Sequence, residues 1–296
     1  NMKSLILDLR HNGGGYLSAA TALADEFLPD KQLIVYTQGE HEPRTDYFAS
    51  KNGKFEKGKL VLLIDETTAS ASEVLAGAIQ DLDRGVVIGR RSFGKGLVQE
   101  QFNFGDGSAL NLTIARYYTP LGRSIQKPYN MSNEEYFAEA SKRLYNNKPV
   151  IQSKKDSTAK PFKTSAGRVL FSGAGIMPDI QIPVDTSAFN SFFYSLRGSG
   201  ILREFLFENI LREKHPTSMQ KILAEFNLSD ERFKELLAFA AKNGIKASGK
   251  AAAIARDAIT TEIKASLARF YFGEEAYYKV INASDKAIAR SLQELK

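Results

Sequence analysis

The segment LVLLIDETTASASEVLAGAIQDL, residues 60–82, places three kinds of element in direct succession. Its apolar run at 60–64 has the length of a buried strand, and residues 71–82 carry the apolar periodicity of a helix. Between them lies a run of small hydroxyl residues, which are favoured in turns and at helix N-caps. A buried strand that leads through a turn into an apolar helix is the repeating unit of an α/β fold.

The alternation of strand and helix continues on both sides of this segment. Apolar runs predict strands at 5–9, 33–37 and 86–89, and a helix at 18–28. Residues 97–104 and 108–118 predict two more strands, and Gly105-Asp106-Gly107 between them has the residue types of a hairpin turn. The sequence therefore predicts an α/β core with a mixed sheet.

Helical periodicity replaces the strand pattern after about residue 184. The expected helices lie at 201–213, 218–226, 230–243, 251–272 and 285–295. Ser229 stands before Asp230 and Glu231, so one of these helices should begin with a serine cap and acids in its first turn. We therefore expect two domains, a core at 1–184 and an all-helical C-terminal domain at 185–296.

A polar stretch at 127–172 interrupts the core domain. It contains runs such as Asn146-Asn147-Lys148-Pro149, and its one helical pattern lies near 133–145. We expect a mobile polar insertion that carries a single short helix.

Composition excludes several classes of protein. With 43% hydrophobic and 25% charged residues, the chain is not typical of disordered, collagen-like or membrane-spanning proteins. The net charge of +6 is spread along the chain, so nucleic acid is not an expected partner. The absence of Cys excludes disulfides, thiolate metal sites and thiol nucleophiles, and the three His lie far apart in sequence. No metal or other cofactor is expected.

Two glycine-rich segments imitate nucleotide-binding motifs. Residues 89–95 fit G-x-x-x-x-G-K, but Gly96 stands where Ser or Thr should bind magnesium, and a strand is predicted where the motif needs a helix. Gly13-Gly14-Gly15 follows a strand and precedes a helix, yet lacks the G-x-G-x-x-G spacing. Its bare amides suit an anion or an oxyanion as well as a plain turn. Nucleotide binding is the weakest of the functional hypotheses.

The hydroxyl run at 67–72 offers a nucleophile. A serine at the start of a helix is most often a cap, but the helix N-terminus can also stabilise the charge on an attacked carbonyl oxygen. Lys95, between Gly94 and Gly96 after the next strand, is placed to take a serine proton if it is desolvated. A Ser–Lys dyad needs no histidine, which suits this composition. The dyad serine is Ser70 or Ser72.

Together these residues resemble the carboxyl-terminal processing peptidases, or tail-specific proteases, of the S41 family. Five motifs match in family order across residues 4–184: LDLRHNGGG at 7–15, SASE with AGAIQD at 70–81, FGKGLVQ at 93–99, YTPLGRSIQ at 118–126 and GIMPDI at 175–180. The resemblance implies a ClpP/crotonase-like peptidase core. It also implies a serine endopeptidase that cleaves polypeptides near their C-termini, in the periplasm or cell envelope.

The resemblance also implies a role for each matching residue. Ser70 would be the nucleophile and Lys95 the general base, because Lys95 lies 25 positions after Ser70, which is the family spacing. Gln99 would orient the lysine. The amides of Ala71 and of one glycine in the 13–15 run, with Gly14 preferred, would form the oxyanion hole.

The sequence departs from the family pattern in two ways. Gly13 stands where many relatives have proline, which should loosen the loop without removing its amides. The family's N-terminal helices, PDZ domain and first peptidase strands do not precede the matched motifs, so we expect a piece of a longer enzyme. Its partners would be polypeptide substrates and that missing N-terminal and PDZ region, and an oligomer remains open. The alternative is a catalytically idle peptide-binding scaffold or an inactive fragment.

Overall fold

The computed structural model describes residues 2–50, 52–130, 132–146, 160–184, 189–211 and 216–296. By its internal contacts the chain divides into two compact units, residues 1–183 with 290–296, and residues 184–289. In the described part of the chain, no helix combines the length and hydrophobicity that crossing a bilayer requires.

A parallel sheet forms the centre of the first unit. Its strand order is β1 (Ser4–Asp8), β4 (Lys59–Ile64), β5 (Val86–Gly89) and β10 (Ile180–Gln181). The central strand β4 is buried from Leu60 to Ile64, which explains why its sequence is continuously apolar rather than alternating.

An antiparallel sheet forms a second layer. Its order is β3 (Thr45–Phe48), β2 (Leu33–Gln38), β7 (Ala109–Tyr118) and β6 (Leu97–Asn103). Strands β6 and β7 are the predicted hairpin, and Gly107 has a φ of 87° in its turn. The predicted combination of parallel and antiparallel strands is confirmed, with the two kinds of pairing in separate sheets.

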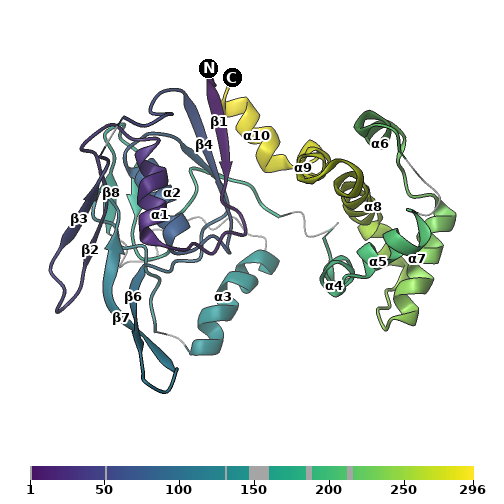
Figure 1. The fold of residues 1–296 in the computed structure, drawn as a ribbon, viewed down its shortest axis with the longest axis horizontal. Coiled ribbons are helices and arrows are strands. Elements are labelled where there is room, and N and C mark those ends of the chain that lie inside the picture. The colour runs from purple at the N-terminus through teal and green to yellow at the C-terminus, as the bar shows by residue number, and fades with distance from the viewer. Residues whose placement is uncertain (1, 51, 131, 147–159, 185–188, 212–215) are drawn as a thin grey trace. The chain divides into compact units, whose positions relative to one another are not determined.

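Two helices lie between these sheets (Figure 1), α1 (Leu17–Asp25) and α2 (Ala71–Asp81). All eleven residues of α2 are buried, because the helix packs on β2 on one side and on β5 on the other. One hydrophobic cluster joins side chains of both helices to both sheets, for example Ala24, Leu75, Ile34 and Leu62. The helix that begins after Ser70 is therefore held on all sides.

The polar insertion contains one described helix, α3 (Asn133–Asn146), where a short helix was predicted. Its continuation at 147–159 lies outside the described residues. A two-stranded hairpin follows, β8 (Pro161–Lys163) with β9 (Val169–Phe171), which the sequence pattern did not predict.

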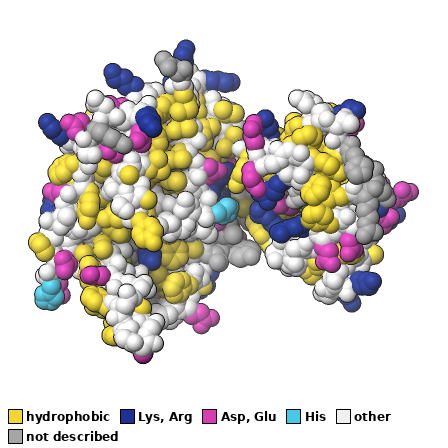
Figure 2. Space-filling view, viewed as in Figure 1, with side chains coloured by type: hydrophobic (Ala, Val, Ile, Leu, Met, Phe, Trp, Pro, Cys, Tyr) yellow, Lys and Arg dark blue, Asp and Glu magenta, His cyan; other side chains and the backbone are white. Residues whose placement is uncertain are grey.

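Surface charge on the visible face is mixed. Figure 2 shows Lys and Arg side chains interspersed with Asp and Glu. The net charge of +6 therefore forms no single basic field on this face.

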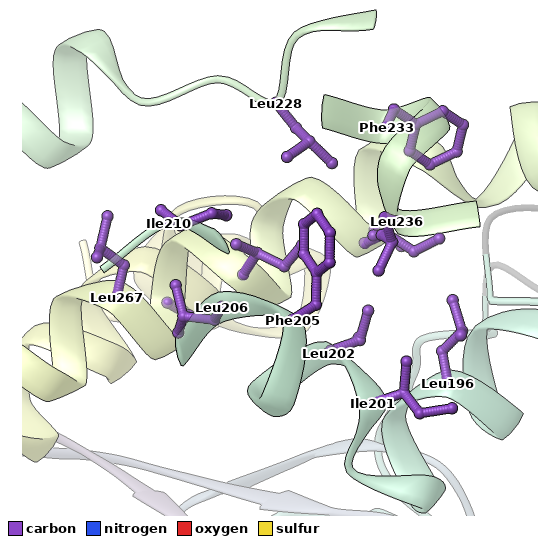
Figure 3. Close-up of a cluster of buried hydrophobic side chains, with 14 of the residues drawn as sticks. Leu196, Ile201, Leu202, Phe205, Leu206, Ile210, Leu228, Phe233, Leu236 and Leu267 are labelled. Carbon is purple, nitrogen blue, oxygen red and sulfur yellow. The ribbon is translucent and has the colours of Figure 1, made fainter. Parts of the chain in front are cut away.

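The second unit is helical. It comprises α4 (Ser191–Ser199), α5 (Ile201–Asn209), α6 (Met219–Glu225), α7 (Asp230–Lys242), α8 (Gly249–Phe272) and α9 (Glu274–Ala283), and α10 (Lys286–Glu294) begins in it. Its core is a separate cluster around Phe205, Leu236 and Leu267 (Figure 3).

Most of these helices were predicted, and their caps explain where they begin and end. Ser229 caps α7 as expected, because its side chain accepts a hydrogen bond from the backbone N–H of Arg232 at 3.2 Å. Helices α4 and α9 were not predicted. Gly200 adopts φ 81° between α4 and α5, so the chain turns there without losing helical residues on either side. The predicted helix at 201–213 ends earlier, at Asn209, and residues 212–213 lie outside the described part.

Candidate active site

Three loops meet at one edge of the parallel sheet. They are the glycine-rich loop 9–16 after β1, the serine turn 65–70 after β4 and the lysine loop 90–96 after β5. Because β1, β4 and β5 are adjacent and parallel, their carboxyl ends lie side by side, where α/β proteins place their sites. The sheet thus brings together predicted site residues that lie far apart in sequence.

The glycine-rich loop is attached to the serine turn. The backbone N–H of Ala69 donates to the carbonyl of Asn12 at 3.1 Å. Gly14 has a φ of +93°, and a Cβ there would lie 2.8 Å from the nitrogen of Ala71 and 2.9 Å from the Cβ of Ser70. Only glycine fits such a close approach and such a backbone conformation.

Ser70 has an unusual backbone conformation at the start of α2. Its φ of 55° and ψ of −121° fall where non-glycine residues are rare. Such strain costs about 1–3 kcal/mol and is concentrated at functional sites, as at the serine of a nucleophile elbow. Ser70 is partly exposed, whereas Ser72 lies inside the first turn and is only 7% exposed. Accessibility therefore favours Ser70 of the two predicted nucleophiles.

One buried carboxylate joins the serine turn to the lysine loop. Glu73 is fully buried in the first turn of α2, and its Oε2 accepts hydrogen bonds from the backbone N–H of Ser70 at 2.9 Å and of Lys95 at 2.8 Å. Its Oε1 accepts from the backbone N–H of Gly94 at 2.8 Å and bonds to the hydroxyl of Ser92. The two residues of the predicted dyad are thus held by the same carboxylate oxygen.

Burial of Glu73 sets its electrostatics. Desolvation raises the pKa of the Glu73 carboxyl above its ordinary value, and the hydrogen bonds from Ser92, Lys95, Gly94 and Ser70 oppose that rise. Four partners satisfy both oxygens, as a buried carboxyl requires.

The lysine loop is closely packed at both of its glycines. The backbone N–H of Phe93 donates to the carbonyl of Thr68 at 2.9 Å. A Cβ on Gly94 would lie 3.1 Å from the Cβ of Lys127, and one on Gly96 would lie 2.6 Å from the nitrogen of Gln126. The glycines therefore permit close packing on both sides of Lys95. The Lys95 side chain is half-buried, and its amine has no hydrogen-bond acceptor among the described residues.

Gln99 is placed differently from the other predicted site residues. It lies in the edge strand β6, directly after a register shift between Val98 and Gln99, and its side chain is exposed. In the described part of the chain no hydrogen bond joins Gln99 to Lys95, so its role in orienting the lysine stays a prediction.

The two predicted oxyanion-hole amides also differ. The N–H of Ala71, the first of α2, donates to no described residue and is free to receive a ligand. The N–H of Gly14 donates to the side-chain oxygen of Asn12 at 3.0 Å. Gly14 can serve an oxyanion only if this bond is exchanged, and its role likewise stays a prediction.

Asp65 is a second buried carboxylate at the same edge of the parallel sheet. It is fully buried and accepts hydrogen bonds from the backbone N–H groups of His11, Thr67 and Thr68 at 3.0–3.2 Å. Burial alone would raise the pKa of Asp65, but these bonds, the Thr67 hydroxyl and the nearby His11 lower it overall. This carboxylate therefore shapes the serine turn.

Sequence reasoning assigned no role to Glu73 or Ser92. The Ser-x-x-Glu spacing of Ser70 and Glu73 is a capping-box pattern and could have drawn attention to the carboxyl. Ser92 has no comparable signal. After Gly94-Lys95 the chain enters strand β6, so the nucleotide-motif match lacks the helix that the motif requires.

Parts of the chain are similar to known proteins. Residues 1–136 match the model of "Peptidase family S41", and residues 192–273 match a "Family of unknown function (DUF8443)". A carboxy-terminal-processing protease of Bartonella bacilliformis is 46% identical over 126 residues, which are 42% of this chain and 29% of that protein. A carboxyl-terminal-processing protease of Synechocystis is 41% identical over 129 residues, 44% of this chain and 30% of that protein.

Among solved structures, a photosystem II D1 C-terminal processing protease is similar to this chain, with 30% sequence identity and a TM-score of 0.43. The matched region covers 64% of this chain and 37% of the protease chain. The chain spans less than a third of the length of the curated relatives described above. Over residues 1–136 the chain is similar to peptidase family S41.

Proposed function

We propose that the chain carries the catalytic centre of a serine endopeptidase that works by a Ser70–Lys95 dyad. The observation that carries the proposal is that one oxygen of the Glu73 carboxylate accepts hydrogen bonds from the backbone N–H groups of both Ser70 and Lys95. A dyad needs its nucleophile and base fixed relative to each other, and a shared buried acceptor provides that.

The proposed reaction has two steps. In acylation, neutral Lys95 accepts the proton of the Ser70 hydroxyl while the serine oxygen attacks a peptide carbonyl, and the ammonium then protonates the leaving amine. In deacylation, Lys95 accepts a proton from water while the water oxygen attacks the acyl-serine ester. The Lys95 ammonium then returns this proton to the Ser70 oxygen as the ester bond breaks, and the carboxylic acid that is released ionises in solvent.

The charge that develops on the carbonyl oxygen needs hydrogen-bond donors. The free N–H of Ala71 at the positive end of α2 is one candidate, and a glycine of the 13–15 run is the other. Gln99 would hold the Lys95 amine from strand β6 once a substrate orders both side chains. Neither a metal nor another cofactor takes part in this proposal.

The substrates would be polypeptides, cleaved near their C-termini, since the curated relatives are named carboxyl-terminal-processing proteases. A location in the periplasm or cell envelope, and a partner region at the N-terminal side that includes a PDZ domain, belong to the proposal through the family resemblance.

Cleavage of unfolded casein tests the proposal. The chain, and a form extended to the length of its curated relatives, would be compared with Ser70→Ala and with Ser72→Ala as the matched control. We expect Ser70→Ala to abolish cleavage and Ser72→Ala to retain most of it. Cleavage that survives Ser70→Ala would contradict the proposal. Binding of casein without any cleavage would favour the peptide-binding scaffold instead.

A further inference from the structure

We propose that α3 positions the catalytic lysine, with Arg143 as its main positioning residue. This inference rests on the proposed function, because it assigns α3 to the Ser70–Lys95 site. Glu139 and Arg143 lie in α3 beyond residue 136, where the match to peptidase family S41 ends.

Arg143 holds the backbone just before the lysine. Its Nη1 donates to the carbonyl of Arg91 at 2.9 Å, and its Nη2 donates to the carbonyl of Ser92 at 3.1 Å. The Ser92 hydroxyl bonds in turn to Glu73, the carboxylate that holds Ser70 and Lys95. A continuous chain of hydrogen bonds therefore runs from α3 to both members of the dyad.

Glu139 keeps Arg143 in this position. Its carboxylate pairs with Arg91, with the Nε of Arg143 at 2.9 Å and with the Nζ of Lys127 at 3.6 Å. The Arg143 side chain is only 12% exposed. Burial and the nearby Arg91 lower the pKa of Arg143 to about 10, so the guanidinium is still charged at neutral pH.

Tyr136 holds the backbone just after the lysine. Its hydroxyl accepts a hydrogen bond from the side-chain amide of Gln126 at 2.9 Å, and the side-chain oxygen of Gln126 accepts the N–H of Gly96 at 2.9 Å. The Nζ of Lys127 donates to the carbonyl of Tyr136 at 2.7 Å. The same ammonium lies 4.0 Å from the ring centres of Phe93 and Tyr136.

The lysine loop needs such support because of its own sequence. Glycines stand on both sides of Lys95, and glycine has the largest freedom to lose when a backbone is fixed. Glu73 restrains Gly94 and Lys95 from the side of α2, and α3 restrains Ser92 and Gly96 from outside. Together they place the lysine without any contact to its amine.

Hydrogen exchange and kinetics test this inference with Arg143→Gln. Lys142→Gln is the matched control, because it removes the same charge from the neighbouring, exposed position of α3. We expect Arg143→Gln to speed exchange of the Gly94 and Lys95 amides by about tenfold while the amides of β4 keep their rates. We expect kcat to fall about 10- to 100-fold with KM within about twofold, because the lysine is displaced and the substrate contacts are not.

The outcomes separate this inference from the proposed function. Unchanged exchange at Gly94 and Lys95 in Arg143→Gln, or equal effects of Lys142→Gln, would overturn the role of α3 whatever the activity. Cleavage that survives Ser70→Ala would overturn the proposed function instead. If Arg143→Gln also speeds exchange of the β4 amides, the substitution destabilises the whole unit, and the milder variant Tyr136→Phe then tests the role of α3. It should speed exchange of the Gly96 amide alone, and a wild-type rate there would overturn the inference.

Discussion

Glu73 joins Ser70 to Lys95, the proposed nucleophile and the proposed base, because it accepts a hydrogen bond from the backbone N–H of each. The spacing of Ser70 and Glu73 shows in the sequence as a capping box, but the return of the lysine loop onto the same carboxyl does not, because it depends on how β5 pairs with β4. The sequence therefore predicts the residues of the dyad and misses the group that holds them.

Glu73→Gln should weaken both the fold and the activity. In the glutamine variant, the side-chain nitrogen cannot accept the hydrogen bonds that one carboxylate oxygen of Glu73 accepts from backbone N–H groups. A buried donor without a partner costs about 1–3 kcal/mol. Because burial raises the pKa of Glu73 above its ordinary 4.5, proton uptake stabilises the native state. That contribution is complete below about pH 4.5 and is lost as pH rises through the raised pKa.

Urea unfolding between pH 4 and pH 8 checks this expectation. The difference in unfolding free energy between wild type and Glu73→Gln should be largest at the acid end and should shrink toward pH 8. A difference that grows with pH would show that the carboxyl is ionised in the native state at lower pH than we infer.

Gly14→Ala should disturb the serine turn. The added methyl would lie 2.6 Å from the carbonyl oxygen of Ala69 and would force a φ of +93° on alanine. Gly13→Ala is the control, because a Cβ there meets nothing within 4 Å. We expect Gly14→Ala to lose about 1–3 kcal/mol of stability and most peptidase activity, and Gly13→Ala to lose little. Thermal unfolding and casein cleavage measure both, and equal effects would contradict the described packing.

At the scale of elements, the strands and helices with a strong apolar pattern were predicted, whereas the short strands β3, β8, β9 and β10 and the helices α4 and α9 were not. Strand β4 is apolar from Leu60 to Ile64, and helix α2 has no polar side chain from Val74 to Ile79, because both segments are buried on both faces. Strand β10 has only two residues and is held by pairing with β5, so it has no period of its own to detect. The split between α4 and α5 depends on one left-handed glycine, Gly200, inside a continuous helical pattern.

Asp83 ties the end of α2 to the turn between β8 and β9. Desolvation opposes its ionisation, but the backbone N–H of Ala166, the Ser165 hydroxyl and Arg168 together lower the pKa of Asp83 to about 2. Since the pKa is lowered from 3.8, the stabilisation is complete above about pH 4 and is lost as pH falls toward 2.

Asp83→Asn should therefore cost about 1 kcal/mol at pH 7, allowing for solvent screening, and almost nothing near pH 2. Chemical denaturation at both pH values measures this cost, with Asp30→Asn as a control on the exposed surface. A cost that is the same at both pH values would contradict the role of the charge.

At the scale of the whole molecule, the two units have separate hydrophobic cores. Leu236 is fully buried in the helical core, whereas Leu223 in the same unit is 40% exposed. Leu236→Ala should destabilise the helical unit by about 2–5 kcal/mol, and Leu223→Ala should have little effect. Scanning calorimetry should show one transition moving and the other in place. A single transition that moves as a whole would contradict the independence of the cores.

The central claim is that Ser70 and Lys95 act as one unit. Its most direct test is a double-mutant cycle on cleavage of a fluorogenic peptide, with Ser70→Ala, Lys95→Ala and the double variant. Groups that act together lose their whole effect at the first substitution. We predict that the double variant is no slower than either single variant. Losses that multiply in the double variant would show that the two residues act separately and would contradict the dyad.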